Sequence, residues 1–188
     1  MTKRKNIVLI FLILLVIVTL IYRAYTIHFT NEAIINKVID REEYSLSLET
    51  KQIPVELFIK PEWIAFNKDE RKELTIDLLE MHNTNILLDN VWNRGNDIYF
   101  SFATIFNMKY KEGEFLYNGF FNDDGTFTSP LEEVKLYDKN MNEFPVGQTG
   151  TGPEASFSFG IQPEEQELIR EGFYVKYNGF NLYKYYRR

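Results

Sequence analysis

Acidic side chains are the first candidates for chemistry in this sequence, because they occur as adjacent pairs at positions 69–70, 123–124, 132–133 and 164–165. Glycoside hydrolysis uses two carboxyl groups that face each other about 5 to 9 Å apart. Two acids that are adjacent in sequence do not by themselves have that geometry. Such pairs are also expected in the solvent-exposed turns of an acidic domain. We interpret the pairs as solvated turn residues, and a cell-envelope hydrolase using acidic loop residues is an alternative function.

Asp123 and Asp124 lie in the stretch Asn122-Asp123-Asp124-Gly125, which offers oxygen ligands and a glycine bend to a calcium ion. No acid stands at the downstream positions that would complete a calcium loop. The stretch therefore predicts a tight hairpin turn and no resident cofactor, with calcium at Asp123 and Asp124 as the alternative.

Metal and nucleophilic chemistry have few candidate residues, since the chain contains no cysteine and the two histidines His28 and His82. This composition excludes a disulfide framework, a thiolate nucleophile and a cysteine zinc site. His82 follows Met81 in an expected turn, and no HExxH helix supplies zinc ligands. We predict no metal site and no catalytic residue.

Two other sets of residues are candidates for interactions. Gly147, Gly150 and Gly152 lie in a glycine-rich run without the lysine of a phosphate-binding loop, so they predict a mobile loop that could contact a partner. Trp63 and Trp92 are either a stacking platform for a sugar or peptide or residues at the edge of the core.

A membrane segment is the clearest feature of the sequence. The sixteen residues IVLIFLILLVIVTLIY run from Ile7 through Leu14 to Tyr22. At about 1.5 Å per residue the run covers about 24 Å, and a few further residues extend it toward the roughly 30 Å of a bilayer core. We predict an anchor that lies in the lipid bilayer over residues 7–25.

The charges around the anchor predict its orientation. Basic residues occupy positions 3–5 before the run, and Arg23 follows it. The positive-inside rule then places residues 1–6 in the cytoplasm and the C-terminal domain outside the cell membrane. A cleaved signal peptide is the alternative, but the small residues of a cleavage site are missing after the run.

The exterior part is acidic. Residues 1–23 carry four of the 21 basic side chains and none of the 27 acidic ones, so the rest of the chain has 17 basic against 27 acidic groups, a net charge of −10. Nucleic-acid binding depends mainly on neutralising phosphates, so we predict no nucleic-acid partner.

The exterior sequence begins with a helical pattern and continues with strand patterns. Residues 26–42 predict a juxtamembrane stalk with a short helix capped by Thr30. Alternating residues predict strands in the remainder, with a hairpin around a turn at 93–97 and either helix or strand between Pro61 and Met81. The predicted strands are 44–48, 55–59, 73–81, 86–92, 98–106, 115–121, 134–137, 156–161 and 173–186.

Residues 73–186 resemble a known class of exterior domain. The segments TNILLDNVWNRGNDIYFSFATIF, EVKLYDKNMNEFP, FSFGI and GFYVKYNGF are similar to immunoglobulin-like domains of single-pass membrane proteins of Gram-positive bacteria, many of them of unknown function. The resemblance implies an immunoglobulin-like antiparallel β-sandwich over residues 43–188, which is a fold and a compartment but not a reaction.

The tetrapeptide YNGF occurs twice, at 117–120 and 177–180, without further repeated sequence around it. In the second copy, Asn178-Gly179 predicts a type I′ hairpin turn that pairs Tyr177 with Phe180. In the first copy the pair is expected inside a strand or at a bulge, with the chain reversing at 123–125.

These patterns together predict a non-catalytic module for binding, sensing or envelope interaction, with an unidentified protein or envelope partner. A structural or assembly partner of other membrane proteins is a further alternative. The apolar run contains no glycine that would allow close helix packing, and this argues against the structural or assembly role.

Overall fold

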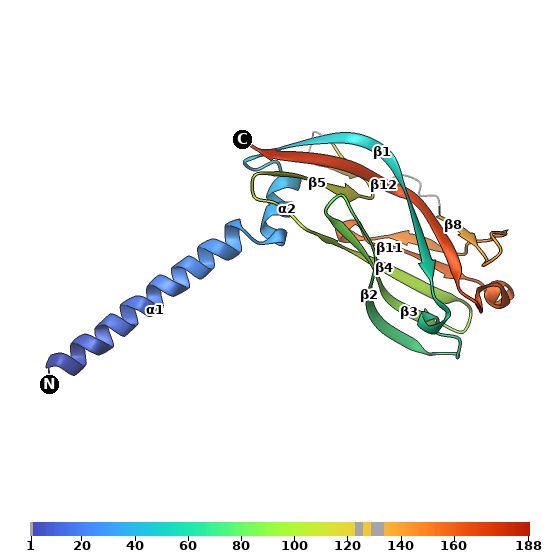
Figure 1. Cartoon of the computed structure of the whole chain (residues 1–188), viewed down its shortest axis with the longest axis horizontal. Helices are drawn as coiled ribbons and strands as arrows, with labels where there is room; N and C mark the ends of the chain where they lie inside the picture. Colours follow the sequence, from blue (N-terminus) through green and yellow to red (C-terminus); the bar gives the residue numbers. More distant parts are fainter. Residues whose placement is uncertain (1, 123–125, 129–133) are drawn as a thin grey trace.

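The computed structural model describes residues 2–122, 126–128 and 134–188. The protein is mainly β, and its helices α1 (Thr2–His28) and α2 (Asn31–Ile39) lie at the N-terminus. Figure 1 shows α1 projecting from one end of a β body, with α2 lying against that end. The connections between strands include the 3₁₀ turns η1 (Pro61–Trp63), η2 (Pro153–Ala155) and η3 (Pro163–Ile169).

The described strands form two five-stranded antiparallel sheets and a short hairpin. Sheet A has the order β1-β12-β8-β9, and β5 pairs with the far end of β12. Its strands are β1 (Tyr44–Ile59), β5 (Glu112–Tyr117), β8 (Val134–Tyr137), β9 (Glu143–Phe144) and β12 (Phe173–Arg187). Sheet B has the order β10-β11-β4-β3-β2. Its strands are β2 (Arg71–Met81), β3 (Thr84–Asn93), β4 (Ile98–Phe106), β10 (Thr149–Thr151) and β11 (Phe157–Ile161). The hairpin consists of β6 (Phe120–Phe121) and β7 (Phe127–Thr128). The predicted mainly β, antiparallel class is confirmed.

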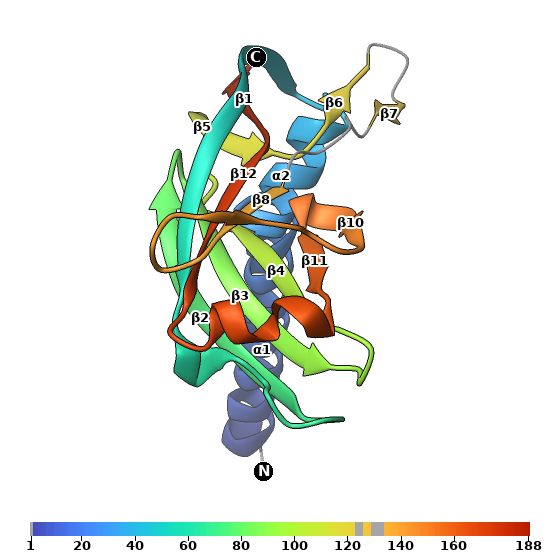
Figure 2. The ribbon, with the colours of Figure 1, turned by 90° about the vertical axis from the view of Figure 1, so that its right-hand side faces the viewer.

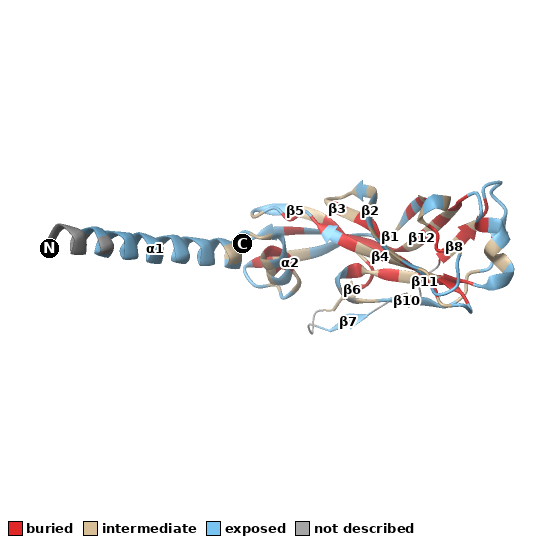
Figure 3. Ribbon diagram, turned by 90° about the horizontal axis from the view of Figure 1, so that it is seen from below, coloured by how far each residue is buried: buried red, intermediate tan, exposed pale blue. Residues whose placement is uncertain are grey.

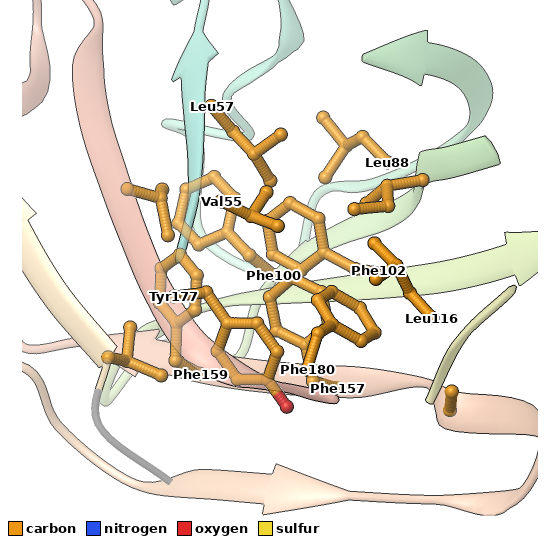
Figure 4. Close-up of a cluster of buried hydrophobic side chains, with 14 of the residues drawn as sticks. Val55, Leu57, Leu88, Phe100, Phe102, Leu116, Phe157, Phe159, Tyr177 and Phe180 are labelled. Atoms are coloured by element: carbon orange, nitrogen blue, oxygen red, sulfur yellow. The ribbon is translucent and has the colours of Figure 1, made fainter. Parts of the chain in front are cut away.

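Aromatic rings fill the core between the two sheets (Figure 4). The Phe157 ring of β11 stacks on the Tyr177 ring of β12, with centroids 4.1 Å apart, and on the Phe102 ring of β4 at 4.5 Å. Phe100 of sheet B meets Phe173 of sheet A edge to face at 5.2 Å. Because these contacts join the sheets, the rings hold both sheets in one core.

Helix α1 contains the segment Leu9–His28, which is long and apolar enough to cross a membrane and has none of its residues buried. Figure 3 shows the described part of α1 as exposed, except for intermediate positions near its C-terminal end. Helix α2 begins as predicted, since the Thr30 hydroxyl accepts a hydrogen bond from the Ala33 N–H at 3.2 Å. The α2 residues that join the core are Ile34, Ile35 and Val38.

The predicted hairpin around residues 93–97 is confirmed, since Asn93 of β3 pairs with Ile98 of β4. The ambiguous stretch from Pro61 to Met81 resolves into η1 followed by β2. A two-residue turn of His82 and Asn83 joins β2 to β3 with φ angles of 50° and 53°. Positive φ at both positions is the type I′ geometry that matches the strand twist.

The predicted turn at Asn178-Gly179 is wrong, because β12 continues through both residues. Tyr177 pairs with Val55 of β1, and Phe180 pairs with Ile53. Between these two pairs the chain advances three residues along β12 but only two residues along β1. This mismatch is a bulge with one extra residue. The strand is central in sheet A, with β1 on one edge and β8 and β5 on the other, so pairing along both edges outweighs the local turn preference.

The first YNGF copy lies where a strand breaks, since β5 ends at Tyr117 and β6 begins at Phe120. Phe121 pairs with Phe127, so the chain reverses between 122 and 126 as predicted. Residues 123–125 themselves lie outside the described part. The first copy lies next to the residue that follows the second copy, because Tyr117 pairs with Asn181, whose amide donates to the Gly119 carbonyl at 3.1 Å.

The strand conformation of the second copy gives a mutational prediction. A Cβ at Gly179 would lie 2.3 Å from the Tyr177 hydroxyl, and Tyr177 is fully buried and stacked on Phe157. We expect Gly179→Ala to lower the free energy of unfolding by about 1–3 kcal/mol through overpacking. At Gly119 the Cβ would meet the ring of Phe127, which is 44% exposed and can rotate away. Urea titrations in which Gly119→Ala costs as much as Gly179→Ala would contradict this account.

The turn from β8 to β9 gives a pH prediction. Hydrogen bonds from the Asn142 side chain, and then from the Asn142 and Asn140 backbone amides, lower the pKa of Asp138. A folded pKa below the unfolded value of about 3.9 means that the turn adds stability above about pH 4 and loses it as the pH falls through the folded pKa. Melting temperatures between about pH 5 and pH 2 should therefore fall more steeply for the wild type than for Asp138→Asn. Parallel curves would refute the assignment.

Candidate ligand-binding face

The outer face of sheet B is the surface formed by its side chains that point away from sheet A. Along β4, Phe100 and Phe102 are buried in the core, while Tyr99 and Ser101 point outward and are half-buried. Period-two alternation extends this division to the neighbouring strands. Figure 2 shows β2, β3 and β4 side by side, and the strand pairing adds β11 and β10 to the same sheet.

An aromatic row crosses this face. Arg71 pairs with Trp92, and Trp92 pairs with Tyr99, so the three residues are neighbours on β2, β3 and β4. Trp92 is 41% exposed, and the Arg71 guanidinium carbon lies 5.9 Å from its ring centroid. Arg94 lies 4.1 Å from the Tyr99 centroid and is held by the buried Asp97 through an Nε–Oδ1 hydrogen bond of 2.7 Å. A guanidinium group therefore lies over each ring, and 41% of Trp92 remains exposed to solvent.

A polar row runs beside the aromatic row. Asn90 pairs with Ser101, Ser101 with Ser158, and Ser158 with Gly150. The Ser158 hydroxyl donates to the Gly150 carbonyl at 3.2 Å and lies 2.6 Å from the Tyr99 hydroxyl. Because the serine proton is used, Tyr99 is the donor in the second bond. The two rows are therefore joined into one hydrogen-bonded surface.

Charge on this face is concentrated at its edge. Charged side chains occupy the outer positions of the edge strand β2, at Arg71, Glu73, Asp77 and Glu80. Asp89 is the extra residue at the β3 bulge between Leu88 and Asn90. The paired outward residues of the central strands are uncharged, namely Leu87, Asn90, Trp92, Tyr99, Ser101, Ala103, Ile105 and Ser158. The central strands thus present hydroxyl and amide groups and two rings, with the Arg71 and Arg94 guanidinium groups beside the rings. Such groups can stack on and hydrogen-bond to a hydroxyl-rich ligand.

The glycine-rich run of predicted interaction residues lies at the β10 edge of sheet B. The expected mobile loop is wrong for its central part, because Gly150 lies in β10, an edge strand paired with β11. Gly147 lies close against β11, where a Cβ would stand 2.9 Å from the Gly160 carbonyl oxygen, and Gly152 donates its N–H to Ser156 at 3.0 Å. Backbone pairing therefore orders this run.

The two tryptophans do not form one platform. Trp92 lies on the outer face of sheet B, whereas Trp63 lies in η1, between β1 and β2, and packs against the core. The Lys60 ammonium lies 5.1 Å from the Trp63 ring centroid. The core-edge interpretation therefore fits Trp63, and the open ring of Trp92 fits a ligand platform.

His82 has a structural contact. Its Nδ1 lies 2.7 Å from the Glu114 carboxylate, and Asn83 donates to the Glu114 backbone carbonyl at 3.1 Å. These bonds join the β2–β3 turn of sheet B to β5 of sheet A. Across the residues that the structure describes, no three histidine or acidic side chains are grouped to hold a metal ion. The acidic candidates Asp123 and Asp124, and the 132–133 pair, lie outside those residues.

A cavity of about 280 Å³ lies between α2 and the adjoining ends of β4, β5 and η2. Ile35, Phe106 and Tyr117 contribute apolar walls, and Glu32 and Glu154 line it as well. Burial raises the pKa of Tyr117, while the Glu154 and Ala155 backbone amides lower it in part. The cavity therefore lies where α2 packs against the β body.

Comparisons of the chain with family models, with curated proteins and with solved structures find no match. The observed class is a mainly β protein in antiparallel sheets with one N-terminal helix that could span a membrane. Its candidate site therefore rests on the geometry of sheet B.

Proposed function

We propose that the protein is a membrane-anchored, non-catalytic binding module whose outer face of sheet B holds a neutral envelope glycan. The observation that carries this proposal is the open ring of Trp92, set beside Tyr99 and an uncharged row of hydroxyl and amide groups. The C–H faces of sugar rings stack on aromatic rings, and their hydroxyls exchange hydrogen bonds with short polar side chains.

The charge of the exterior part supports a neutral ligand. The chain beyond residue 23 has a net charge of −10, which disfavours nucleic acids and anionic polymers. Among the described strands of sheet B, the acids lie on the edge strand β2, with the exception of Asp89 at the β3 bulge. The centre of the face is therefore not covered by acidic side chains, and a glycan can contact the central strands there.

The proposal includes the location of the body. The apolar segment of α1 crosses the cell membrane, the basic positions 3–5 keep the N-terminus in the cytoplasm, and the β body lies outside. Residues 26–42 form a short stalk that docks on the body through α2. The ring-rich core between two antiparallel sheets supports an immunoglobulin-like sandwich, although such a fold serves many functions.

Co-sedimentation with insoluble glycans tests the function. Full-length protein in a neutral detergent is mixed with peptidoglycan sacculi, chitin or cellulose and then pelleted. We expect retention on at least one of these glycans, and at least about tenfold weaker retention for Ser101→Arg, which places a large cation in the polar row. Ser47→Arg, on an exposed position of β1, adds the same charge on the other sheet and should bind as the wild type does. Equal retention of the two variants, or no retention of the wild type on any of the three glycans, would overturn the proposal.

A further inference from the structure

The basic side chains of the body converge at the end from which α1 departs. The Arg187 N–H donates to the Lys111 carbonyl at 2.7 Å, and the Arg188 guanidinium donates to the Arg41 carbonyl at 3.0 Å. Lys37 of α2 joins them through Glu43, which it approaches at 3.8 Å and which Arg187 approaches at 2.6 Å. We call the set of six basic residues the juxtamembrane cluster: Lys37, Arg41, Lys109, Lys111, Arg187 and Arg188.

Direct contacts tie this cluster to the exit of α1. The Lys37 ammonium lies 2.9 Å from the His28 Nδ1 at the last position of α1. The Phe29 ring stacks on Tyr110 with centroids 4.7 Å apart, and the Arg187 guanidinium carbon lies 4.4 Å from the Tyr110 centroid. In Figure 1 the C-terminus lies beside α2 at this same end. If α1 spans a bilayer, the cluster therefore lies at the level where the helix leaves it.

Aromatic rings at this end match the membrane interface. Phe29 is 48% exposed and Tyr186 is 57% exposed. Aromatic side chains beside the end of a spanning helix prefer the interfacial region, where one side is apolar and the other wet. Exposed aromatic rings thus occur both just after α1 and at the C-terminal end of β12.

The local charge is opposite to that of the exterior part as a whole. The segments 31–43, 109–112 and 187–188 contain the six basic residues of the cluster and five acidic residues, Glu32, Asp40, Glu42, Glu43 and Glu112, a net charge of +1. The whole chain beyond residue 23 has a net charge of −10. Lys109 and Lys111, on the turn between β4 and β5, are exposed. The net charge argues against adhesion of the whole domain to anionic lipid, but this end carries a positive excess.

We propose that the juxtamembrane cluster and its rings bind the headgroups of anionic phospholipids and hold the body against the outer surface of the bilayer. The charge of the cluster complements the lipid phosphate, and its direct connection to α1 places it within reach of the headgroups. The inference goes beyond glycan binding and does not depend on what sheet B holds. Its effect would be to fix the direction in which the outer face of sheet B is presented.

The test uses full-length protein in a neutral detergent, titrated with short-chain phosphatidylglycerol or phosphatidylcholine. Each basic residue near an anionic lipid surface contributes roughly fivefold in affinity, so Lys109→Gln/Lys111→Gln should bind phosphatidylglycerol roughly 30-fold more weakly. Lys68→Gln/Lys139→Gln removes the same charge from exposed positions outside the cluster and should leave binding unchanged. Phosphatidylcholine should bind all three proteins weakly and alike.

Three outcomes would overturn the proposal. The wild type could bind both lipids equally, the two double variants could lose the same affinity, or free glycerol phosphate could displace phosphatidylglycerol at comparable concentration. The last result would indicate an anion site instead of a lipid surface. Retention on glycans is measured separately with Ser101→Arg, so failure of lipid binding and failure of the proposed function are distinguishable.

Discussion

Replacing Phe157 with alanine is expected to lower the free energy of unfolding by about 3–5 kcal/mol, the range for removing a buried aromatic ring. Phe157 is 2% exposed, and its ring stacks on Tyr177 of sheet A and on Phe102 of its own sheet. The change opens a cavity at the junction of the sheets, where neighbours from both sides lose contacts. Because small domains are stable by about 5–15 kcal/mol, this loss is a large part of the total.

Urea unfolding followed by tryptophan fluorescence measures this effect, since Trp63 and Trp92 lie in different parts of the body. Phe127→Ala is the matched control, because the same side chain is 44% exposed in the β6–β7 hairpin. We expect the control to cost less than about 1 kcal/mol. Similar costs at the two positions would show that the core does not depend on this stack.

Replacing Trp92 with alanine is expected to weaken glycan retention by about 10- to 30-fold while leaving the fold intact. The ring is 41% exposed and lies on the outer face of sheet B, so its removal takes away the stacking surface without opening the core. The loss of the Arg71 contact at 5.9 Å should affect stability little, since that contact is at the surface.

Trp63→Ala separates ligand stacking from the loss of any tryptophan. Trp63 lies in η1 and packs partly against the core, so its removal should cost stability and leave retention nearly unchanged. Retention curves for peptidoglycan sacculi, chitin and cellulose measure both variants. If Trp63→Ala weakens retention as much as Trp92→Ala, the outer face of sheet B is not the binding surface.

Local patterns predicted the elements that depend on local physics. The apolar run predicted a helix that could span a membrane, and Thr30 predicted the start of α2. The alternation around residues 93–97 predicted the β3–β4 hairpin. In each case the deciding interactions lie within a few residues in sequence, where side-chain periodicity and turn chemistry act directly.

The Asn178-Gly179 turn failed as a prediction because its outcome depends on distant strands. The pair has the turn preference expected of Asn-Gly, but Tyr177 pairs with Val55, which lies more than a hundred positions earlier. The glycine-rich run failed similarly, since Gly150 becomes a strand residue through its pairing with Ser158. Tertiary pairing commonly overrides local propensity in strands.

The candidate site was predictable only in part. Trp92 and Gly150 were recognised from residue type, but their common face required the register of sheet B. Tyr99 and Ser101 could have been added from the sequence, because they alternate with buried phenylalanines in a predicted strand. Ser158 could not be joined to them without knowing that β11 lies beside β4.

The most direct test of the central claim determines on which side of the membrane sheet B lies. The chain contains no cysteine, so Thr149→Cys on the exposed edge strand β10 and Thr2→Cys at the N-terminus each introduce a single thiol. A membrane-impermeant maleimide applied to intact cells should label Thr149→Cys, and it should label Thr2→Cys only after the membrane is permeabilised. Labelling of Thr2→Cys on intact cells, with Thr149→Cys protected until permeabilisation, would contradict the account. Mature protein that has lost residue 2 would contradict the uncleaved anchor.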